Sequence, residues 1–205
     1  EQYALSLGGP HKYLLAAELA GETTSILDAW DGETTIILTL PMPVGLSPGM
    51  YYVDVIATNV EDATVAVSQR INVEILDTAA LAVSDESSDQ SFLPGSMDTS
   101  DRSFTITNYG NNEDRFTITL SVPDGMVAEI IDPMPIGGVA TTPVVASGET
   151  FDAIVRFRFL DGSDGSQTLE LIATSVNEPS ISSTGVATYL VGRQGTIDLV
   201  PPTPA

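Results

Sequence analysis

The acidic connection at residues 84–102 carries the side chains best suited to binding a metal ion. Its sequence, SDESSDQSFLPGSMDTSDR, contains Asp85, Asp89, Asp98 and Asp101. Calcium takes loop oxygens at about 2.3–2.6 Å without strict geometry, although the spacing here differs from that of an EF-hand loop. The four aspartates therefore indicate a calcium site, the one cofactor that the sequence suggests. The alternative is a solvated acidic loop.

The residue types in the chain give weaker support for catalysis. The chain has one histidine, His11 in GGPHKY, and no cysteine. A Ser-His-Asp arrangement needs the histidine to lie against a nucleophile and a carboxylate, whereas the turn-like sequence around His11 predicts a solvent-exposed loop. Zinc and copper sites need several imidazole or thiolate ligands. Carboxylate pairs of the glycosidase kind arise without function among 28 acidic residues. We expect that the chain is not an enzyme.

Aromatic side chains are too few to predict a sugar-binding platform. Trp30 precedes a turn at residues 31–32, and Tyr51, Tyr52 and Tyr109 lie at expected strand or loop edges. A carbohydrate-binding face usually presents several coplanar rings, but aromatic residues make up only 6% of this chain. Packing in the core or at strand edges is the favoured interpretation, and glycan binding stays open as the alternative.

The charge balance excludes several partners. Lys and Arg total 7 against 28 Asp and Glu, for a formal net charge of −21, while hydrophobic residues still make up 42% of the chain. Such an acidic surface repels nucleic acid and anionic lipid headgroups. No apolar run approaches the roughly 20 residues that cross a bilayer, and the first residues lack the pattern of a signal peptide. We expect a folded chain with no nucleic-acid partner and no direct membrane insertion in this segment.

The same charge predicts that salt stabilises the fold. Most of the carboxylates are ionised at neutral pH, and few basic residues are available to pair with them. Added salt shortens the Debye length, which is about 8 Å at physiological ionic strength. We therefore expect the melting temperature to rise from low to molar sodium chloride in differential scanning calorimetry. A flat or falling melting temperature would argue against repulsion between surface carboxylates.

An internal repeat organises the elements that position these residues. Gly49–Asn59, GMYYVDVIATN, aligns with Gly165–Ser175, GSQTLELIATS, at a shift of 116 residues. The other matching segments are residues 32–34 with 148–150, 71–75 with 187–191 and, at a shift of 113, residues 1–7 with 114–120. Loop lengths therefore differ between the copies while the strand pattern persists.

The repeat divides the chain into three parts. We expect an incomplete immunoglobulin-like sandwich over residues 1–76, with its first strands missing, and a complete one over residues 77–192. Residues 193–205 are expected to begin a third repeat or to form a tail that donates a strand.

Alternation of apolar and polar residues predicts strands throughout the complete copy. The turn sequences TNYGNNED, PDG, SGE and DGSDGS separate these strands. Two ambiguous segments, YLLAAEL at residues 13–19 and MVAEIID at residues 126–132, are also expected to be strands. About seven or eight strands with such punctuation predict an all-β chain of tandem immunoglobulin-like antiparallel β-sandwiches. The apolar positions that define the alternation are Phe104, Ile106, Phe116, Ile118, Leu120, Phe151, Phe157, Phe159, Leu169, Leu171 and Ala173.

The sequence FTITNYGNNEDRFTITLSVPDG, followed by an ASGE turn and by LELIATS, resembles a family of prokaryotic surface modules. It is similar to the CARDB-type and alpha-galactosidase-associated immunoglobulin-like domains. The resemblance covers the complete copy and, from its third strand onward, the first copy. It implies a spacer, an adhesive module or an appendage of a larger extracellular protein, and says nothing about a ligand.

Three functions fit a repeated sandwich without a chemical site. The favoured one is a non-enzymatic structural building block of an extracellular surface layer, stalk or filament, because repeats stack domain by domain. The alternatives are an adhesive or glycan-binding module and an accessory domain of a larger secreted hydrolase. We expect an extracellular or cell-surface location, and as partners either neighbouring copies of the chain or adjacent repeats of a longer one.

The last strand-like segment is the candidate for assembly. Ile197 and Leu199 fall on Leu81 and Val83 at the 116-residue shift. This segment either continues a longer array or inserts into the incomplete first sandwich of a neighbouring copy by strand addition. The second alternative must explain how one tail supplies one strand where two are missing. The candidate assembly residues are Thr196, Ile197, Asp198, Leu199 and Val200.

Overall fold

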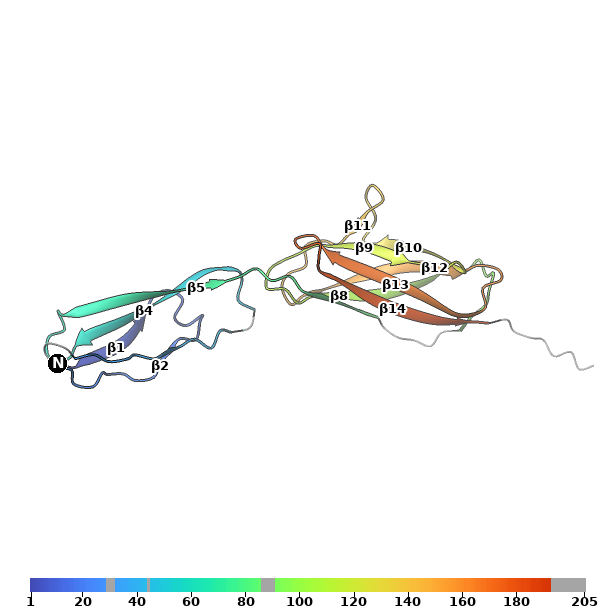
Figure 1. Cartoon of the computed structure of the whole chain (residues 1–205). Helices are drawn as coiled ribbons and strands as arrows, with labels where there is room; N and C mark the ends of the chain where they lie inside the picture. The colour runs from blue at the N-terminus through green and yellow to red at the C-terminus, as the bar shows by residue number, and fades with distance from the viewer. Residues whose placement is uncertain (29–31, 44, 86–90, 193–205) are drawn as a thin grey trace, which may run out of the picture. The chain divides into compact units, whose positions relative to one another are not determined.

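The computed structural model describes residues 1–28, 32–43, 45–85 and 91–192. Every regular element in these ranges is a β-strand, which confirms the all-β prediction (Figure 1). The chain divides into two compact units, Glu1–Thr78 and a second that begins at Ala79. No hydrogen-bonded sheet contains strands of both units.

The second unit is a sandwich with immunoglobulin topology, antiparallel apart from the short parallel pairing of β7 with β14. Its sheets have the orders β10-β12-β8-β6 and β11-β9-β13-β14-β7. With β6, β8, β9, β10, β12, β13 and β14 named A to G, these orders contain the ABED and CFG sheets of a constant-type immunoglobulin domain. The strands are β6 (Leu81–Asp85), β7 (Ser91–Phe92), β8 (Ser100–Asn108), β9 (Phe116–Ser121), β10 (Met126–Asp132), β11 (Ala140–Thr141), β12 (Thr150–Phe159), β13 (Gly165–Ser175) and β14 (Ser182–Val191).

The core of the second unit forms where the predicted alternation points inward. Along β12 the side chains of Val155, Phe157 and Phe159 are buried, while the residues between them are more exposed. The rings of Phe92, Phe157, Phe159 and Tyr189 cluster with centroids 4.6–5.8 Å apart. Because the chain has no cysteine, this packing replaces the disulfide that crosses many immunoglobulin sandwiches.

A buried asparagine fixes the turn that joins β8 to β9. The side-chain amide of Asn108 donates to the carbonyl oxygens of Asn112 and Val145, both at 2.9 Å, and its oxygen accepts from the Gly110 N–H. Asn108 is almost fully buried, so these bonds offset the cost of removing a polar side chain from water. The polar sequence TNYGNNED is therefore a structural turn.

The first unit holds fewer strands than the second. It has one sheet of order β1-β4-β5 and one of order β2-β3. By topology these correspond to β9-β13-β14 and β10-β12, and no described strand of the first unit takes the places of β6 and β8. Its strands are β1 (Tyr3–Gly8), β2 (Glu18–Leu19), β3 (Leu38–Thr39), β4 (Gly49–Asn59) and β5 (Ala66–Ile75).

The two three-stranded ladders share one register. Val53 faces Ile71 in the β4–β5 ladder, and the residues 116 positions later, Leu169 and Ala187, face each other in the β13–β14 ladder. The pairs in the β1–β4 ladder correspond in the same way to those between β9 and β13, with a shift of 113 for the first strand. Residues matched by sequence therefore occupy matched places in the two sheets.

A threonine hydrogen bond also recurs in both units. The Tyr3 N–H donates to Thr24 Oγ1 at 3.1 Å, and the Phe116 N–H donates to Thr142 Oγ1 at 2.9 Å. Both threonines are buried. In each unit the bond joins the first strand of the three-stranded ladder to a later segment that lies along the free edge of that strand. The aligned segments of the repeat do not include these two threonines.

The strand predicted over residues 13–19 is wrong for most of its length. The Leu15 N–H donates to the His11 carbonyl and the Ala17 N–H to the Lys12 carbonyl, both at 2.9 Å, which closes a turn. Ala16 lies in the left-handed region with φ 49°. Only Glu18–Leu19 is a strand, whereas the similar segment Met126–Asp132 forms a strand as predicted.

Tyr189→Phe is expected to make the second unit less sensitive to alkaline pH. Burial raises the pKa of Tyr189 to about 12; the smaller effect of the Arg102 charge lowers it and that of the Asp85 charge raises it. An unfolded tyrosine ionises near pH 10, so the unfolded chain releases the proton first and stability falls as pH rises from about 10 to about 12. The variant lacks this loss, and urea unfolding at pH 7 and pH 11 measures the difference.

At pH 7 we expect Tyr189→Phe to be at least as stable as the wild type. The Tyr189 hydroxyl is buried and has no hydrogen-bond partner among the described residues, and such a group costs about 1–3 kcal/mol. Tyr109→Phe is the control, because Tyr109 is exposed. Equal alkaline losses in the wild type and Tyr189→Phe would contradict the prediction.

Candidate functional site

The inner side of the three-stranded sheet in the first unit is apolar and incompletely covered. Side chains alternate across a strand, and the ladder registers place the residues of three strands on one side. Only Val53 among them is fully buried, and Val67 is 66% exposed. We call this surface the open face; its apolar residues are Leu5 and Leu7 of β1, Val53 and Val55 of β4, and Val67, Ile71 and Val73 of β5. The polar side chain of Gln69, opposite Val55, lies on the same side.

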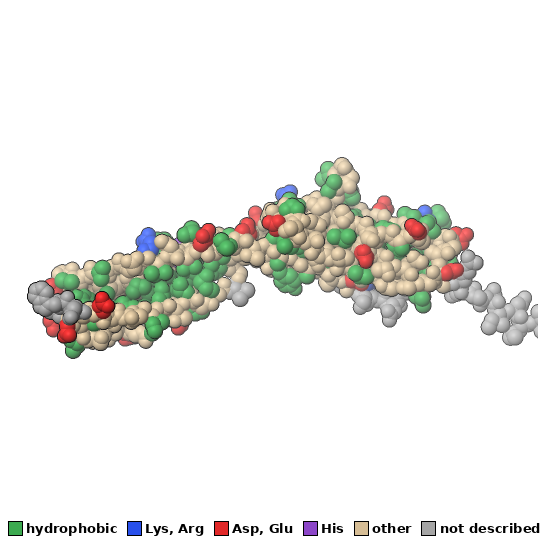
Figure 2. All heavy atoms as spheres, viewed as in Figure 1, with side chains coloured by type: hydrophobic (Ala, Val, Ile, Leu, Met, Phe, Trp, Pro, Cys, Tyr) green, Lys and Arg blue, Asp and Glu red, His purple; other side chains and the backbone are tan. Residues whose placement is uncertain are grey.

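The matched surface of the second unit is buried. Ala187 and Tyr189, which correspond to Ile71 and Val73, are 1% and 2% exposed. Strands β6 and β8 provide the cover: a Cβ on Gly185 of β14 would lie 2.6 Å from Val83 Cγ1 and 2.9 Å from Phe104 Cδ1. Since the described part of the first unit has no strand in these places, its sheet face remains accessible, and Figure 2 shows hydrophobic side chains gathered there.

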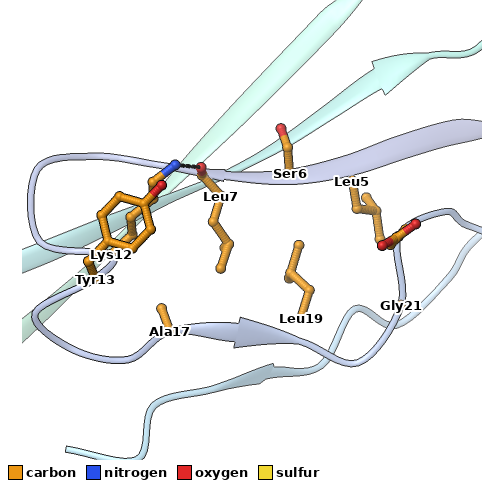
Figure 3. A pocket seen from close by; sticks show the side chains of 9 residues that line it. Leu5, Ser6, Leu7, Lys12, Tyr13, Ala17, Leu19 and Gly21 are labelled. Carbon is orange, nitrogen blue, oxygen red and sulfur yellow. Dashed lines mark hydrogen bonds between the residues drawn. The ribbon is translucent and has the colours of Figure 1, made fainter. Parts of the chain in front are cut away.

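A cavity of about 430 Å³ separates β1 from β2 in the first unit (Figure 3). Leu5 and Leu7 of β1 point toward Leu19 of β2 across this space, and the Lys12 ammonium closes one end by donating to the Leu7 carbonyl at 3.0 Å. Its wall combines the aliphatic side chains of Leu5, Leu7, Ala17 and Leu19 with polar residues that include Lys12 and Glu22. The aliphatic part can take apolar side chains.

Strand β3 is short for its position. It comprises two residues paired with β2, whereas its counterpart β12 has ten residues and pairs with both β10 and β8. Among the described residues β3 has no partner on its other side. The backbone along residues 36–40, before Pro41, can therefore accept a further strand, because unpaired strand edges bind other strands.

The outer side of the same sheet carries polar and charged side chains that contact one another and need no covering layer. Arg70 Nε donates to Asp54 Oδ1 at 2.9 Å, and its guanidinium lies 3.8 Å from the centre of the Tyr52 ring. Asp54 and Arg70 face each other directly in the β4–β5 ladder. This side has the character of a solvated surface, so the open face is the distinctive surface of the first unit.

His11 has a structural contact rather than the exposed position predicted for it. The Tyr52 N–H donates to His11 Nδ1 at 3.1 Å, and the rings of Tyr51 and Tyr52 lie edge-on to the imidazole at 5.1 and 5.2 Å. The histidine is half-buried. These contacts attach the turn at residues 10–16 to β4, and they also occupy two of the tyrosines considered for glycan stacking, while Trp30 lies outside the described residues.

Two of the four predicted calcium ligands bind arginines. Asp85 Oδ1 accepts from Arg102 Nε at 2.6 Å, and Asp101 accepts from Arg156 Nε at 2.8 Å. The remaining two ligands are Asp98, which lies in an exposed loop, and Asp89, which lies outside the described residues. Within the described ranges no three acidic or imidazole side chains form a metal-binding group. The calcium site stays a prediction.

Arg156 also lowers the pKa of the Asp101 carboxyl, because its guanidinium donates to that carboxylate. The pair is largely exposed. A bound cation at Asp101 would have to compete with this arginine, so the bond weighs against Asp101 as a ligand.

The assembly residues predicted from the sequence, Thr196 to Val200, lie outside the described residues. Their predicted acceptor, the incomplete first sandwich, is the unit that carries the open face. The residues of that face were not predicted from the sequence. The 116-residue shift could have identified them, because the β4 and β5 residues of the open face match core positions of the second unit. Val67, which matches Ser183, is the exception.

The described ranges contain no helix long and apolar enough to span a bilayer. No protein-family model and no curated protein sequence matches the chain. The resemblance to CARDB-type and alpha-galactosidase-associated domains therefore stays a prediction.

Several solved structures are similar in part. The S-layer protein SbsC, domains 4 and 5, has a TM-score of 0.36 and 14% identity over 71% of this chain and 66% of that one. An Escherichia coli alpha-2-macroglobulin has a TM-score of 0.39 and 17% identity over 78% and 14%. The secreted serine protease VesC from Vibrio cholerae has a TM-score of 0.36 and 16% identity over 55% and 23%. Likeness at this level carries no conclusion about function.

Proposed function

We propose that the chain is a non-enzymatic structural building block of an extracellular surface layer, stalk or filament. The observation that carries the proposal is the open face, an apolar sheet surface that its matched counterpart in the second unit keeps buried. Contiguous apolar surface of this kind marks a protein-binding site in soluble proteins. The chain therefore acts by joining other β-structure.

The remaining groups support a structural role. Asp85 and Asp101 bind arginines, and His11 accepts a backbone hydrogen bond. The high density of carboxylates keeps such a chain soluble outside its specific contacts, because like charges disfavour nonspecific association. Association is thereby limited to surfaces where apolar contact outweighs repulsion.

Concentration-dependent assembly of the purified chain tests the proposal. Analytical ultracentrifugation and electron microscopy at rising concentration and salt are expected to show multi-copy assemblies. Val67→Asp places a charge on the open face and is expected to raise the concentration needed for assembly by about tenfold or more, because a desolvated charge opposes apolar contact. Val67 is already 66% exposed, so the variant should fold.

Ser68→Asp is the matched control. Ser68 is the next residue of β5, is exposed and points to the opposite side of the sheet. It adds the same charge without touching the open face, and we expect assembly as in the wild type. A wild-type chain that remains monomeric at every concentration would contradict the proposed function. Glycan binding by a monomer that Val67→Asp leaves unchanged would favour the adhesive alternative.

A further inference from the structure

The second unit shows how an immunoglobulin-like sheet of this chain is normally covered. Strand β6 crosses β14 closely enough for the Val83 N–H to donate to Ser183 Oγ at 3.2 Å. Leu81 and Val83 pack against the core. The apolar residues of β6 thus alternate inward, with Ala82 between them.

The chain carries a second segment with the pattern of β6. At the 116-residue shift, Ile197 and Leu199 fall on Leu81 and Val83, and Asp198 falls on Ala82. The same shift gives the correct register for the whole β4–β5 ladder. The likeness therefore rests on a shift that the strand pairing obeys. It predicts that Thr196–Val200 can form a strand that covers a sheet of this type.

The open face differs from its counterpart in a way that favours a single covering strand. At the end of β14 that β6 and β8 approach, the inward residues are small, Ser183 and Gly185. The matched residues of β5 are Val67 and Gln69. Their side chains fill space that in the second unit belongs to Val83 and Phe104, so two strands in those places would collide with them. One strand leaves room for them.

We propose that Thr196–Val200 of a second copy inserts into the first unit as a donor strand. It pairs with the free edge of β3 along residues 36–40, in the place that β8 takes beside β12. It lies across the sandwich from β5, with Ile197 and Leu199 on the open face. Asp198 then points to solvent. The pairing extends β3 toward the length of β12, since added main-chain hydrogen bonds supply affinity and alternate side chains supply specificity.

The proposal rests on the proposed function and names its partner. Residues 1–205 offer one donor segment and one acceptor unit, so the contact between copies of this chain is head-to-tail and propagates as an open chain. Repeating this contact builds a filament or stalk. It also answers the objection that one tail must replace two strands, because the larger side chains on β5 reduce the space to be filled.

Cross-linking between two separately purified full-length variants tests the contact. The chain has no cysteine, so Leu199→Cys and Ile71→Cys each carry one thiol. Packed sheets lie about 10 Å apart, within reach of a short bis-maleimide. Mixing the two variants is expected to give a covalent dimer. Replacing Ile71→Cys by Asn72→Cys moves the thiol to the outer side of β5, and the dimer should then be lost.

Matched substitutions in the donor segment measure its contribution. Leu199→Asp is expected to raise the concentration needed for assembly by about tenfold or more, because it exchanges an apolar contact for a charge. Val200→Asp adds the same charge at a residue that alternation places outward, and should assemble as the wild type does.

The outcomes separate the two proposals. Assembly that survives Leu199→Asp without the Leu199–Ile71 cross-link would overturn donor-strand insertion and leave the structural function standing. A wild-type chain that never assembles would overturn both. A cross-link that forms within single chains of an Ile71→Cys/Leu199→Cys double variant at high dilution would show that the segment belongs to the same copy, and would overturn insertion between copies.

Discussion

Arg102→Ala is expected to lower the free energy of unfolding of the second unit by about 3–5 kcal/mol, because it leaves a buried carboxylate without its partner. The Arg102 side chain is 10% exposed and that of Asp85 12%. Arg102 Nε donates to Asp85 Oδ1 at 2.6 Å, and a second guanidinium nitrogen also contacts that oxygen. Urea unfolding followed by circular dichroism measures the loss.

Arg156→Ala supplies the matched control for Arg102→Ala. Arg156 bonds Asp101 in the same sheet, but the two side chains are 41% and 46% exposed. An exposed ion pair of this kind adds little to stability, because solvent screens it. If the two alanine variants cost the same, burial does not govern the strength of these pairs. Replacing Asp85 and Arg102 together by leucines should cost less than Arg102→Ala, because no unpaired charge remains.

Leu171→Ala is expected to destabilise the second unit by about 2–5 kcal/mol. Leu171 is fully buried in β13 between the two sheets. Val55 occupies the matched position of the first unit and is only partly buried. We expect Val55→Ala to cost less than about 1 kcal/mol in the unassembled chain, because little apolar surface leaves water there on folding.

Differential scanning calorimetry separates these effects when the two units melt in distinct transitions. Leu171→Ala should shift the transition of the second unit and Val55→Ala should hardly shift that of the first. Assembly is expected to increase the cost of Val55→Ala, since a partner then covers the open face. A cost for Val55→Ala near that of Leu171→Ala in dilute monomer would show that the first unit already has a complete core.

The strands of both ladders could be predicted because their information is local. Alternating residues such as Leu169, Leu171 and Ala173 specify a half-buried strand, and the 116-residue shift then specifies the register. What such a pattern cannot state is whether a covering layer is present. Val55 and Leu171 have the same pattern, yet one is partly exposed and the other is buried, because burial depends on β6 and β8 rather than on the strand itself.

The repeat predicts burial less well in β3, which has no described strand on one side. A shift of 116 residues places Ile37 and Thr39 on the buried residues Ala153 and Val155 of β12. In the structure Leu38, between them, is the better-buried residue of β3. The alternation of buried and exposed residues is therefore offset by one position in this segment. Its sequence match was limited to the turn at residues 32–34, and a turn does not fix the phase of the strand that follows.

The acidic candidates show a different limit of sequence analysis. Asp85 and Asp101 are close in sequence, which suggested a shared metal site. Arg156 lies 55 residues from Asp101 but directly opposite it in the β12–β8 ladder. Pairing across a ladder depends on register between distant segments, so proximity along the chain could not reveal that these carboxylates already have cationic neighbours.

The shortness of β3 has a consequence for the timing of amide hydrogen exchange. Eight residues of β12 pair with β8, and their N–H groups exchange only when the sheet opens. The stretch around β3 has no such ladder among the described residues, so its N–H groups exchange with solvent far sooner. Any strand that docks on this edge slows that exchange residue by residue. The N–H groups of residues 36–40 therefore report, without any label, whether a strand occupies this edge.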